Sequence, residues 1–240
     1  MSISVIVPAY NEELYIAPTL RAITAARDYL QARAECPVEI LVVNNGSTDK
    51  TAEIARGLGA TVLFDSNHNI ARARNCGAKS ASGEVLVFID ADTLVPEPIL
   101  LRIHHLTEDR CLGGGADTLY TPKRASMALY LGIWRVIGKL ATMVQGPLQF
   151  CRKDVFLVIG GYDESILIGE DVDFFFRLCR YAKSVRGSVT HIVDLRVRPS
   201  ARRFDRWPLW RVLVYTNPVF IGLFNRVPRA WGGWYGDVPR

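Results

Sequence analysis

The sequence predicts an α/β fold with a mostly parallel central sheet flanked by helices. Short runs of β-branched residues alternate with longer helical patterns through the first half of the 240 residues, as in consecutive strand–helix–strand units. Hydrophobic residues make up 49% of the chain and charged residues 22%, as in ordinary globular proteins. Disordered, collagen-like and disulfide-stapled classes are therefore excluded, because a chain of this size and composition buries a core of its own.

The first half contains four predicted strands, each a short apolar run: 3–7, 40–43, 61–64 and 85–89. Helices are predicted between them at 12–32, 49–58 and 70–80. Connections of this length are right-handed and make the strands parallel. Because open parallel sheets bind ligands beyond the carboxyl ends of their strands, we expect the functional loops there. These loops are 8–12, 44–49, 65–68 and 90–93.

The second half is less regular. Strands are predicted at 116–119, 148–151 and 185–189. Helices are predicted after Pro96, at 123–143, shortly before Gly160 and at 171–181. Neither an internal repeat nor a linker divides the chain, so we expect one body at 1–195 and a C-terminal extension at 196–240.

The formal net charge of +5 is unevenly distributed. Residues 196–240 hold nine Arg, no Lys and two acidic residues, a net charge of +7, together with four of the five Trp, whereas residues 1–195 carry −2. The body lacks a basic groove and the extension lacks a nucleic-acid-binding motif, so nucleic acid is not the expected partner. Aromatic, apolar and basic residues mixed in this way favour a membrane-surface segment or a homodimer interface. A helix packed within the chain is a third interpretation.

The chain is expected to be cytoplasmic, with the extension at the inner face of the membrane if it binds lipid. The five Cys are scattered and form no C-x-x-C pair, which indicates free thiols in a reducing compartment. The start of the chain lacks the basic and apolar regions of a signal peptide. The longest charge-free stretch of the extension, 212–225, contains Pro218 and is shorter than the roughly 20 residues that span a bilayer.

Two carboxylates follow the apolar strand at 85–89 in the tripeptide Asp90-Ala91-Asp92. Separated by one residue, they point the same way if the strand continues through them. Hard divalent cations such as Mg²⁺ prefer carboxylate oxygens and are often held together with substrate phosphates. The pattern therefore predicts a metal site that neutralises a diphosphate, although an Asp helix cap beside a surface turn has the same sequence.

Six further segments stand in a fixed order around this tripeptide: 5–13, 42–51, 73–78, 81–84, 160–164 and 169–173. Together they resemble the family 2 glycosyltransferases, whose catalytic domain has the GT-A fold, a Rossmann-like sheet flanked by helices. The resemblance covers roughly residues 3–191. It implies an enzyme that uses a nucleoside-diphosphate sugar, with a nucleotide-sugar-binding half at 1–95 and an acceptor half at 96–195.

The resemblance also implies a donor site. The first loop of the family holds the nucleotide base, and the second supplies an acid to the base where this chain has Asn44 and Asn45. An amide both donates and accepts hydrogen bonds, which leaves the base open. An arginine near the base or phosphates corresponds to Arg74, and a basic loop over the diphosphate corresponds to Arg202 and Arg203. The nucleotide-sugar-binding residues implied are Pro8, Ala9, Tyr10, Glu12, Asn45, Arg74, Asp90, Ala91, Arg202 and Arg203.

On the metal side, the resemblance implies Asp92 and Asp90 as ligands of Mg²⁺ or Mn²⁺, completed by His191. On the acceptor side, Glu170 and Asp171 resemble the acidic pair of the family. In an inverting transfer the acceptor hydroxyl loses a proton as it attacks, and Asp171 is expected to accept it. Acids at these positions also suit a helix N-terminus.

The sequence thus predicts a metal-dependent transfer of a single sugar, with inversion, to an acceptor hydroxyl that is lipid-linked or close to a membrane. Processive synthases of the family carry membrane helices and a Q-x-x-R-W motif, which this sequence lacks. Two other classes are weighed: a nucleotidyltransferase and a non-catalytic module that binds sugar nucleotide or membrane. The first usually has a Gly-rich phosphate loop after the first strand, and 8–13 contains no Gly.

Overall fold

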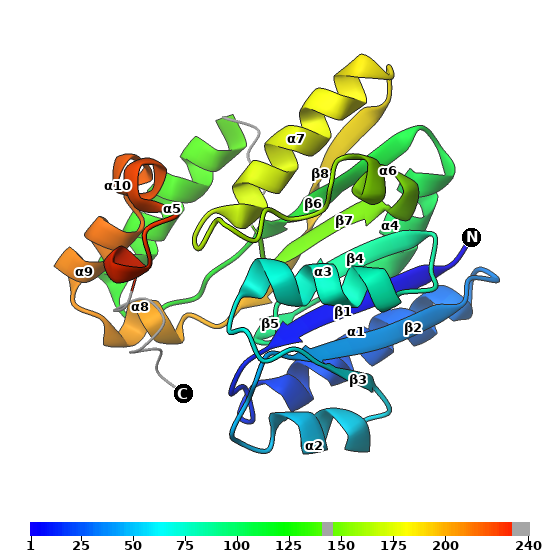
Figure 1. Ribbon diagram of the computed structural model, residues 1–240, viewed down its shortest axis with the longest axis horizontal. Coiled ribbons are helices and arrows are strands. Elements are labelled where there is room, and N and C mark those ends of the chain that lie inside the picture. Colours follow the sequence, from blue (N-terminus) through cyan, green and yellow to red (C-terminus); the bar gives the residue numbers. More distant parts are fainter. Residues whose placement is uncertain (141–145, 232–240) are drawn as a thin grey trace.

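The computed structural model describes residues 1–140 and 146–231, which form a central sheet with helices on both faces (Figure 1). Within these residues, eight strands follow the order β3-β2-β1-β4-β7-β6-β8-β5. The first four of them are parallel neighbours. They are β3 (Thr61–Phe64), β2 (Val38–Asn44), β1 (Ile3–Ala9) and β4 (Val85–Ile89). The α/β class and the mostly parallel sheet predicted from the sequence are confirmed.

The other half of the sheet mixes directions. Strand β7 (Leu148–Arg152) runs antiparallel between β4 and β6 (Cys111–Thr118). Strand β6 is parallel to β8 (Ser188–Pro199), whose end pairs antiparallel with the short β5 (Thr93–Leu94). This last pairing brings the beginning of the extension next to the segment that follows Asp92.

Two cores lie on opposite faces of the sheet. Helices α1 (Ile16–Gln31), α2 (Thr51–Gly57) and α4 (Ile99–Glu108) cover one face. Helices α3 (Ile70–Ser80), α6 (Lys153–Val158) and α7 (Glu170–Ser184) cover the other. Alternation along β1 explains the division: Val5 and Val7 belong to the first core and Ile6 to the second.

Two strands of the second half differ from the sequence prediction. The last strand begins at Ser188 rather than 185 and continues to Pro199, so the boundary expected at 195 falls inside β8. Strand β6 begins at Cys111 rather than 116, because it contains three glycines that carry no β-branched signal. A Cβ on Gly114 would overlap the carbonyl oxygen of Thr190, so glycine is what lets β6 and β8 approach each other there.

The C-terminal extension packs against helix α5 (Ala125–Leu140) (Figure 1). Its elements are α8 (Arg202–Arg206), α9 (Leu209–Tyr215), α10 (Pro218–Phe224) and a 3₁₀ turn at Pro228–Trp231. Met127, Trp207 and Val212 form a small buried cluster between them. One side of the extension is thus packed within the chain, the third of the interpretations above. Residues 141–143 of the helix predicted at 123–143, and residues 232–240 of the extension, lie outside the described residues.

Within 1–140 and 146–231, no helix is both long enough and apolar enough to cross a bilayer.

Candidate active site

The loops that follow β1 and β2 are tied together at the carboxyl edge of the sheet. The backbone N–H of Asn11 donates to Ser47 Oγ (2.9 Å), and the N–H of Thr48 donates to Asn11 Oδ1 (2.7 Å). The N–H of Glu12 donates to Thr51 Oγ1 (2.7 Å). Pro8, Ala9, Tyr10 and Glu12 therefore stand in a fixed relation to the second loop. The structure brings these predicted donor-binding residues together.

The two amides of the second loop have different roles. Asn44 Oδ1 accepts the backbone N–H of Ser47 (2.8 Å) and so closes its own loop. Asn45 is buried, and its Oδ1 has no hydrogen-bond partner among the described residues. Tyr10 stands nearby in the first loop, its ring in edge contact with His68 at 4.7 Å between centroids. An unused buried acceptor is what a ligand with an N–H group would satisfy.

Arg202 joins the extension to the donor loops. Its guanidinium pairs with Glu12 through two N–H groups and lies 3.4 Å from Asp92 Oδ2. It also lies over the ring of Tyr15, 4.3 Å from the centroid. Arg203 is close enough to Asp92 to act on its charge. The basic loop predicted from the sequence thus lies against the predicted metal ligand.

Asp92 is largely buried and lies among both acidic and basic side chains. Burial raises the pKa of Asp92 to about 7; the nearby Glu12 and Asp90 also raise it, whereas Arg202, the largest influence after burial, and Arg203 lower it. A bound cation would stabilise the charged form of such a carboxylate, and Mg²⁺ or Mn²⁺ suits hard oxygen ligands. Asp90 and Asp92 thus offer carboxylate oxygens of the kind that a divalent ion prefers.

His191 does not join this pair, which corrects the expected set of metal ligands. His191 pairs with Gly115 inside β8, whereas the carbonyl oxygen of Asp92 accepts the N–H of Ser200, which follows the end of that strand. In the described part of the chain, no three His, Cys, Asp or Glu side chains come together in a way that holds a metal. The prediction failed because it placed His191 after the end of a strand that in fact continues to Pro199.

Arg74, expected near the base or the phosphates, contacts two carboxylates of the protein. The side chain is only 2% exposed. Its Nη2 lies 2.8 Å from Asp90 Oδ1 and its Nη1 lies 2.7 Å from Glu170 Oε1. Burial alone would lower the pKa of Arg74, but Asp90 and Glu170 raise it above its ordinary value. Arg74 thus bridges the donor-side and acceptor-side carboxylates.

Glu170 and Asp171, the pair expected on the acceptor side, stand at the start of α7. Burial and the neighbouring Asp171 raise the pKa of Glu170 from 4.5 to about 7, against the opposing effect of Arg74. Burial raises the pKa of Asp171 as well, although its carboxylate accepts the backbone N–H groups of Val172 and Gly146. A desolvated carboxylate with a raised pKa is a better general base than an exposed one.

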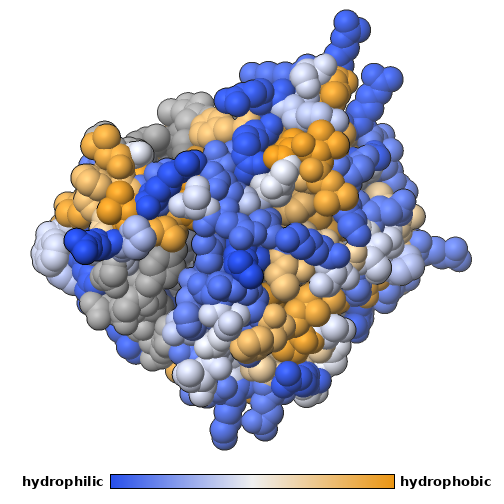
Figure 2. Space-filling view, in the orientation of Figure 1, coloured by the Kyte–Doolittle hydropathy of each residue, from blue (hydrophilic) through white to orange (hydrophobic). Residues whose placement is uncertain are grey.

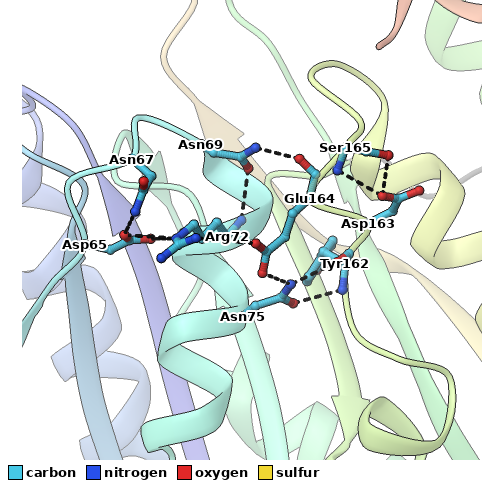
Figure 3. A network of polar contacts seen from close by, with 9 residues as sticks. All are labelled: Asp65, Asn67, Asn69, Arg72, Asn75, Tyr162, Asp163, Glu164 and Ser165. Carbon is cyan, nitrogen blue, oxygen red and sulfur yellow. Dashed lines mark hydrogen bonds and ion pairs between the residues drawn. The ribbon is translucent and has the colours of Figure 1, made fainter.

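A polar network connects α3 to the loop before α7 (Figure 3). Asn75 donates to the carbonyl oxygen of Tyr162 and accepts its N–H, both at 2.9 Å. Asn69 donates to the carbonyl oxygen of Glu164 (2.8 Å), while Arg72 pairs with Asp65 on the other side of the helix start. Helix α3 is therefore fixed to both the donor half and the acceptor half.

Three site residues were not predicted from the sequence. Gln149 donates to the carbonyl oxygen of Asp171 (2.9 Å) and accepts the hydroxyl of Tyr162 (2.9 Å). Tyr120 contacts Phe204 and lies near enough to Asp92, Asp90 and Asp171 for their charges, after burial, to raise its pKa. Gln149 could have been noticed as the polar residue inside the apolar strand predicted at 148–151. Tyr162 lies in 160–164, one of the segments that carry the family resemblance. Nothing in the pattern distinguished Tyr120.

Comparison with known proteins identifies relatives of this chain. The family model described as glycosyl transferase family 2 matches residues 4–113. The chain is 38% identical over 184 residues to glycosyltransferase AglE of Haloferax volcanii, covering 71% of this chain and 59% of that protein. It is 30% identical over 108 residues to the undecaprenyl-phosphate 4-deoxy-4-formamido-L-arabinose transferase of Aeromonas hydrophila, covering 42% and 32%. The chain thus spans less than two thirds of the length of either relative.

Solved structures show the same fold. The mannosyltransferase PcManGT from Pyrobaculum calidifontis, in complex with GDP-Man and Mn²⁺, superposes with a TM-score of 0.66 at 20% identity. The superposition covers 95% of this chain and 68% of that one. The family match, the homologous sequence and the shared architecture together show that the chain belongs to glycosyl transferase family 2 and has the GT-A fold.

Proposed function

We propose that the protein transfers a single sugar from a nucleoside-diphosphate sugar to an acceptor hydroxyl, with inversion at the anomeric carbon. The observation that carries the proposal is the bridging of Asp90 and Glu170 by Arg74, since it sets a donor-side and an acceptor-side carboxylate group at one edge of the sheet. The proposed donor class is supported by the GDP-Man complex of the structural neighbour.

The donor would lie across the loops after β1, β2 and β4. Tyr10 offers a ring to the base, and the unpartnered Oδ1 of Asn45 offers an acceptor to a base N–H. Arg202 and Arg203 suit the diphosphate, because a guanidinium binds phosphate oxygens through two N–H groups. Asp90 and Asp92 would hold Mg²⁺ or Mn²⁺, which when bound neutralises charge on the departing diphosphate.

Asp171 is proposed as the general base. The acceptor oxygen forms a bond to the anomeric carbon as the bond from that carbon to the diphosphate breaks. The hydroxyl proton moves to a carboxylate oxygen of Asp171, and the nucleoside diphosphate leaves with the electron pair. The buried environment that raises the pKa of Asp171 favours this role. Attack from the side opposite the diphosphate produces inversion.

The acceptor is proposed to be lipid-linked and presented at a membrane surface. Helices α5, α9 and α10 expose large apolar side chains: Leu129, Ile133, Val136, Trp210, Leu213 and Leu223. Figure 2 shows part of this apolar surface on the left of the molecule, over the C-terminal helices. Arg residues in the same segments suit anionic headgroups. The relative from Aeromonas hydrophila is named for a polyprenyl-phosphate acceptor, which supports the proposal.

The test begins with a thermal-shift screen of UDP, GDP, ADP and CDP, each with Mg²⁺, Mn²⁺ or EDTA. Stabilisation by one nucleotide that requires the metal is the expected result, because a ligand that binds only the folded state raises its stability. The matching sugar nucleotides are then incubated with octyl glucoside, which offers sugar hydroxyls on an apolar chain, and with water alone.

Release of nucleoside diphosphate is followed in the wild type, Asp92→Asn and Asp171→Asn. Both variants are expected to lose transfer and to remain folded. Asp173→Asn is the matched control, since Asp173 lies in the same helical turn but pairs with Arg177 (2.7 Å). Transfer at the wild-type rate by Asp171→Asn would refute the assignment of the base.

A further inference from the structure

Arg74 occupies a position between two carboxylates that are far apart in the sequence. Asp90 lies 16 residues after it, at the end of β4, and Glu170 lies 96 residues after it, at the start of α7. The guanidinium uses one terminal nitrogen for each, at 2.8 and 2.7 Å. A single side chain thus spans from the donor strand to the acceptor helix.

We propose that Arg74 is a positioning residue for sugar transfer: it fixes the start of α7, and with it Asp171, relative to Asp90. The inference rests on the proposed function, in which Asp171 accepts the acceptor proton. The side chain of Arg74 is 2% exposed and both of its terminal nitrogens contact protein carboxylates, so this role requires no contact with either substrate.

The chemistry of the site requires arginine. The rigid planar fork of a guanidinium presents several N–H donors in fixed directions, so two carboxylates bound to it are held at a set separation. The ammonium group of lysine is a compact point charge on a flexible stem and imposes no such geometry. The cation also offsets two carboxylates whose burial would otherwise be unfavourable.

The guanidinium of Arg74 packs near Tyr162, which is itself held by several hydrogen bonds. The guanidinium carbon of Arg74 lies 5.1 Å from the ring centroid of Tyr162. Asn75, which follows Arg74 in α3, hydrogen-bonds both the N–H and the carbonyl oxygen of Tyr162. The Tyr162 hydroxyl donates to Gln149, which in turn donates to the backbone of Asp171. Arg74 is therefore also connected to the proposed base, Asp171, through Tyr162 and Gln149.

This arrangement argues against direct donor binding. A residue that contacts the diphosphate or base needs a donor group directed into the open site, and both terminal nitrogens of Arg74 are engaged by protein carboxylates. The remaining nitrogen, Nε, is buried and has no partner in the described parts of the chain. Positioning and donor binding make different kinetic predictions, which separates them experimentally.

The experiment compares Arg74→Lys, Arg74→Gln and the double variant Arg74→Gln/Glu170→Gln with the wild type. Measured quantities are the Kd of the nucleoside diphosphate selected by the screen, the KM of its sugar nucleotide, and kcat with octyl glucoside and with water. We expect kcat to fall about 100-fold in all three variants, since displacement of a reacting group by about 1 Å costs that much. The Kd and donor KM are expected to stay within about threefold of wild type, as positioning leaves donor contacts intact.

The double variant covers the case in which Arg74→Gln leaves Glu170 buried and unpaired and does not fold. Arg177→Gln is the control, because it removes an arginine ion pair from α7 without touching Asp90, Glu170 or Asp171. Wild-type kcat in Arg74→Lys, or a rise in Kd and KM with unchanged kcat, would overturn the inference. The proposed function fails separately, through retained transfer by Asp171→Asn.

Discussion

Arg202 pairs with Glu12 across 190 positions of the sequence, with Nη1 2.7 Å from Oε2. The pair joins two segments of the proposed donor site, because Glu12 belongs to the loop after β1 and Arg202 begins the helix α8. Asp92 lies 3.4 Å from the same guanidinium. In the proposed function, an incoming diphosphate would therefore share Arg202 with two carboxylates or replace them.

Arg202→Gln is expected to weaken binding of the selected nucleoside diphosphate. Hydrogen bonds between charged groups contribute about 1.5–3 kcal/mol, so their loss corresponds to roughly a 10- to 100-fold higher Kd. Titration calorimetry in the presence of Mg²⁺ measures this. Arg206→Gln, an exposed arginine on the same helix, is the control and should bind like the wild type. Equal Kd values in the two variants would show that Arg202 does not reach the diphosphate.

Glu170 makes the stability of the ligand-free protein depend on pH. Its pKa is raised from 4.5 to about 7, first by burial and then by Asp171, so the folded state binds a proton more readily than the unfolded chain. The resulting stabilisation is complete below the unfolded value and is lost as the pH rises through about 7.

The free energy of unfolding of the wild type, measured by urea at about pH 5 and pH 8, should therefore contain a part that decreases with rising pH. Glu170→Gln removes that part, and its stability should decrease less over the same interval. An equal or steeper decrease in the variant would contradict the assignment.

Gly146 leaves room for the proposed base. A Cβ at this position would lie 2.6 Å from Asp171 Oδ2, so Gly146→Ala must displace the carboxylate. We expect kcat to fall about 100-fold, with donor KM unchanged. Gly132→Ala is the control: a Cβ there meets no heavy atom within 4 Å, and alanine suits the helix α5. A wild-type kcat in Gly146→Ala would mean that Asp171 can move without loss of function.

The sequence predicted the parts of the site that depend on local pattern. Residues at the ends of β1, β2 and β4 could be placed because strand ends are visible as the last apolar residues before polar loops, and parallel strands bring those ends together. Asp90, Asp92 and Glu12 were found in this way. The acidic pair at the start of α7 was predicted because Glu170 and Asp171 resemble the acidic pair of the family and open a strong amphipathic helix.

What the sequence did not reveal depended on tertiary contacts. Arg74 has the same sequence neighbours whether it faces a nucleotide or bridges Asp90 and Glu170, so only the packing of α7 against α3 decides. His191 was misplaced because charged residues alternate through the second part of β8, and that part was not recognised as strand. The packing of Trp207 against Met127 joins segments 80 residues apart, which no local pattern reveals.

The same packing changes how the membrane proposal must be tested. Deleting the extension would expose Met127 and remove Trp207 and Val212 from a buried cluster, so loss of binding would also follow from damage to the fold. Substitutions on the exposed side avoid this. Trp210, Leu213 and Leu223 are 66%, 44% and 70% exposed, so their replacement by Gln removes apolar surface without opening the core.

The triple variant Trp210→Gln/Leu213→Gln/Leu223→Gln is expected to bind vesicles of phosphatidylglycerol and phosphatidylethanolamine at least about tenfold more weakly, since each buried apolar side chain contributes about 1.5–3 kcal/mol. Co-sedimentation measures the partition coefficient. Leu157→Gln/Val158→Gln removes equally exposed side chains from α6 and should partition like the wild type. If the triple variant partitions unchanged but a wild-type dimer becomes a monomer in sedimentation equilibrium, the exposed side of the extension is a subunit interface and the acceptor need not be at a membrane.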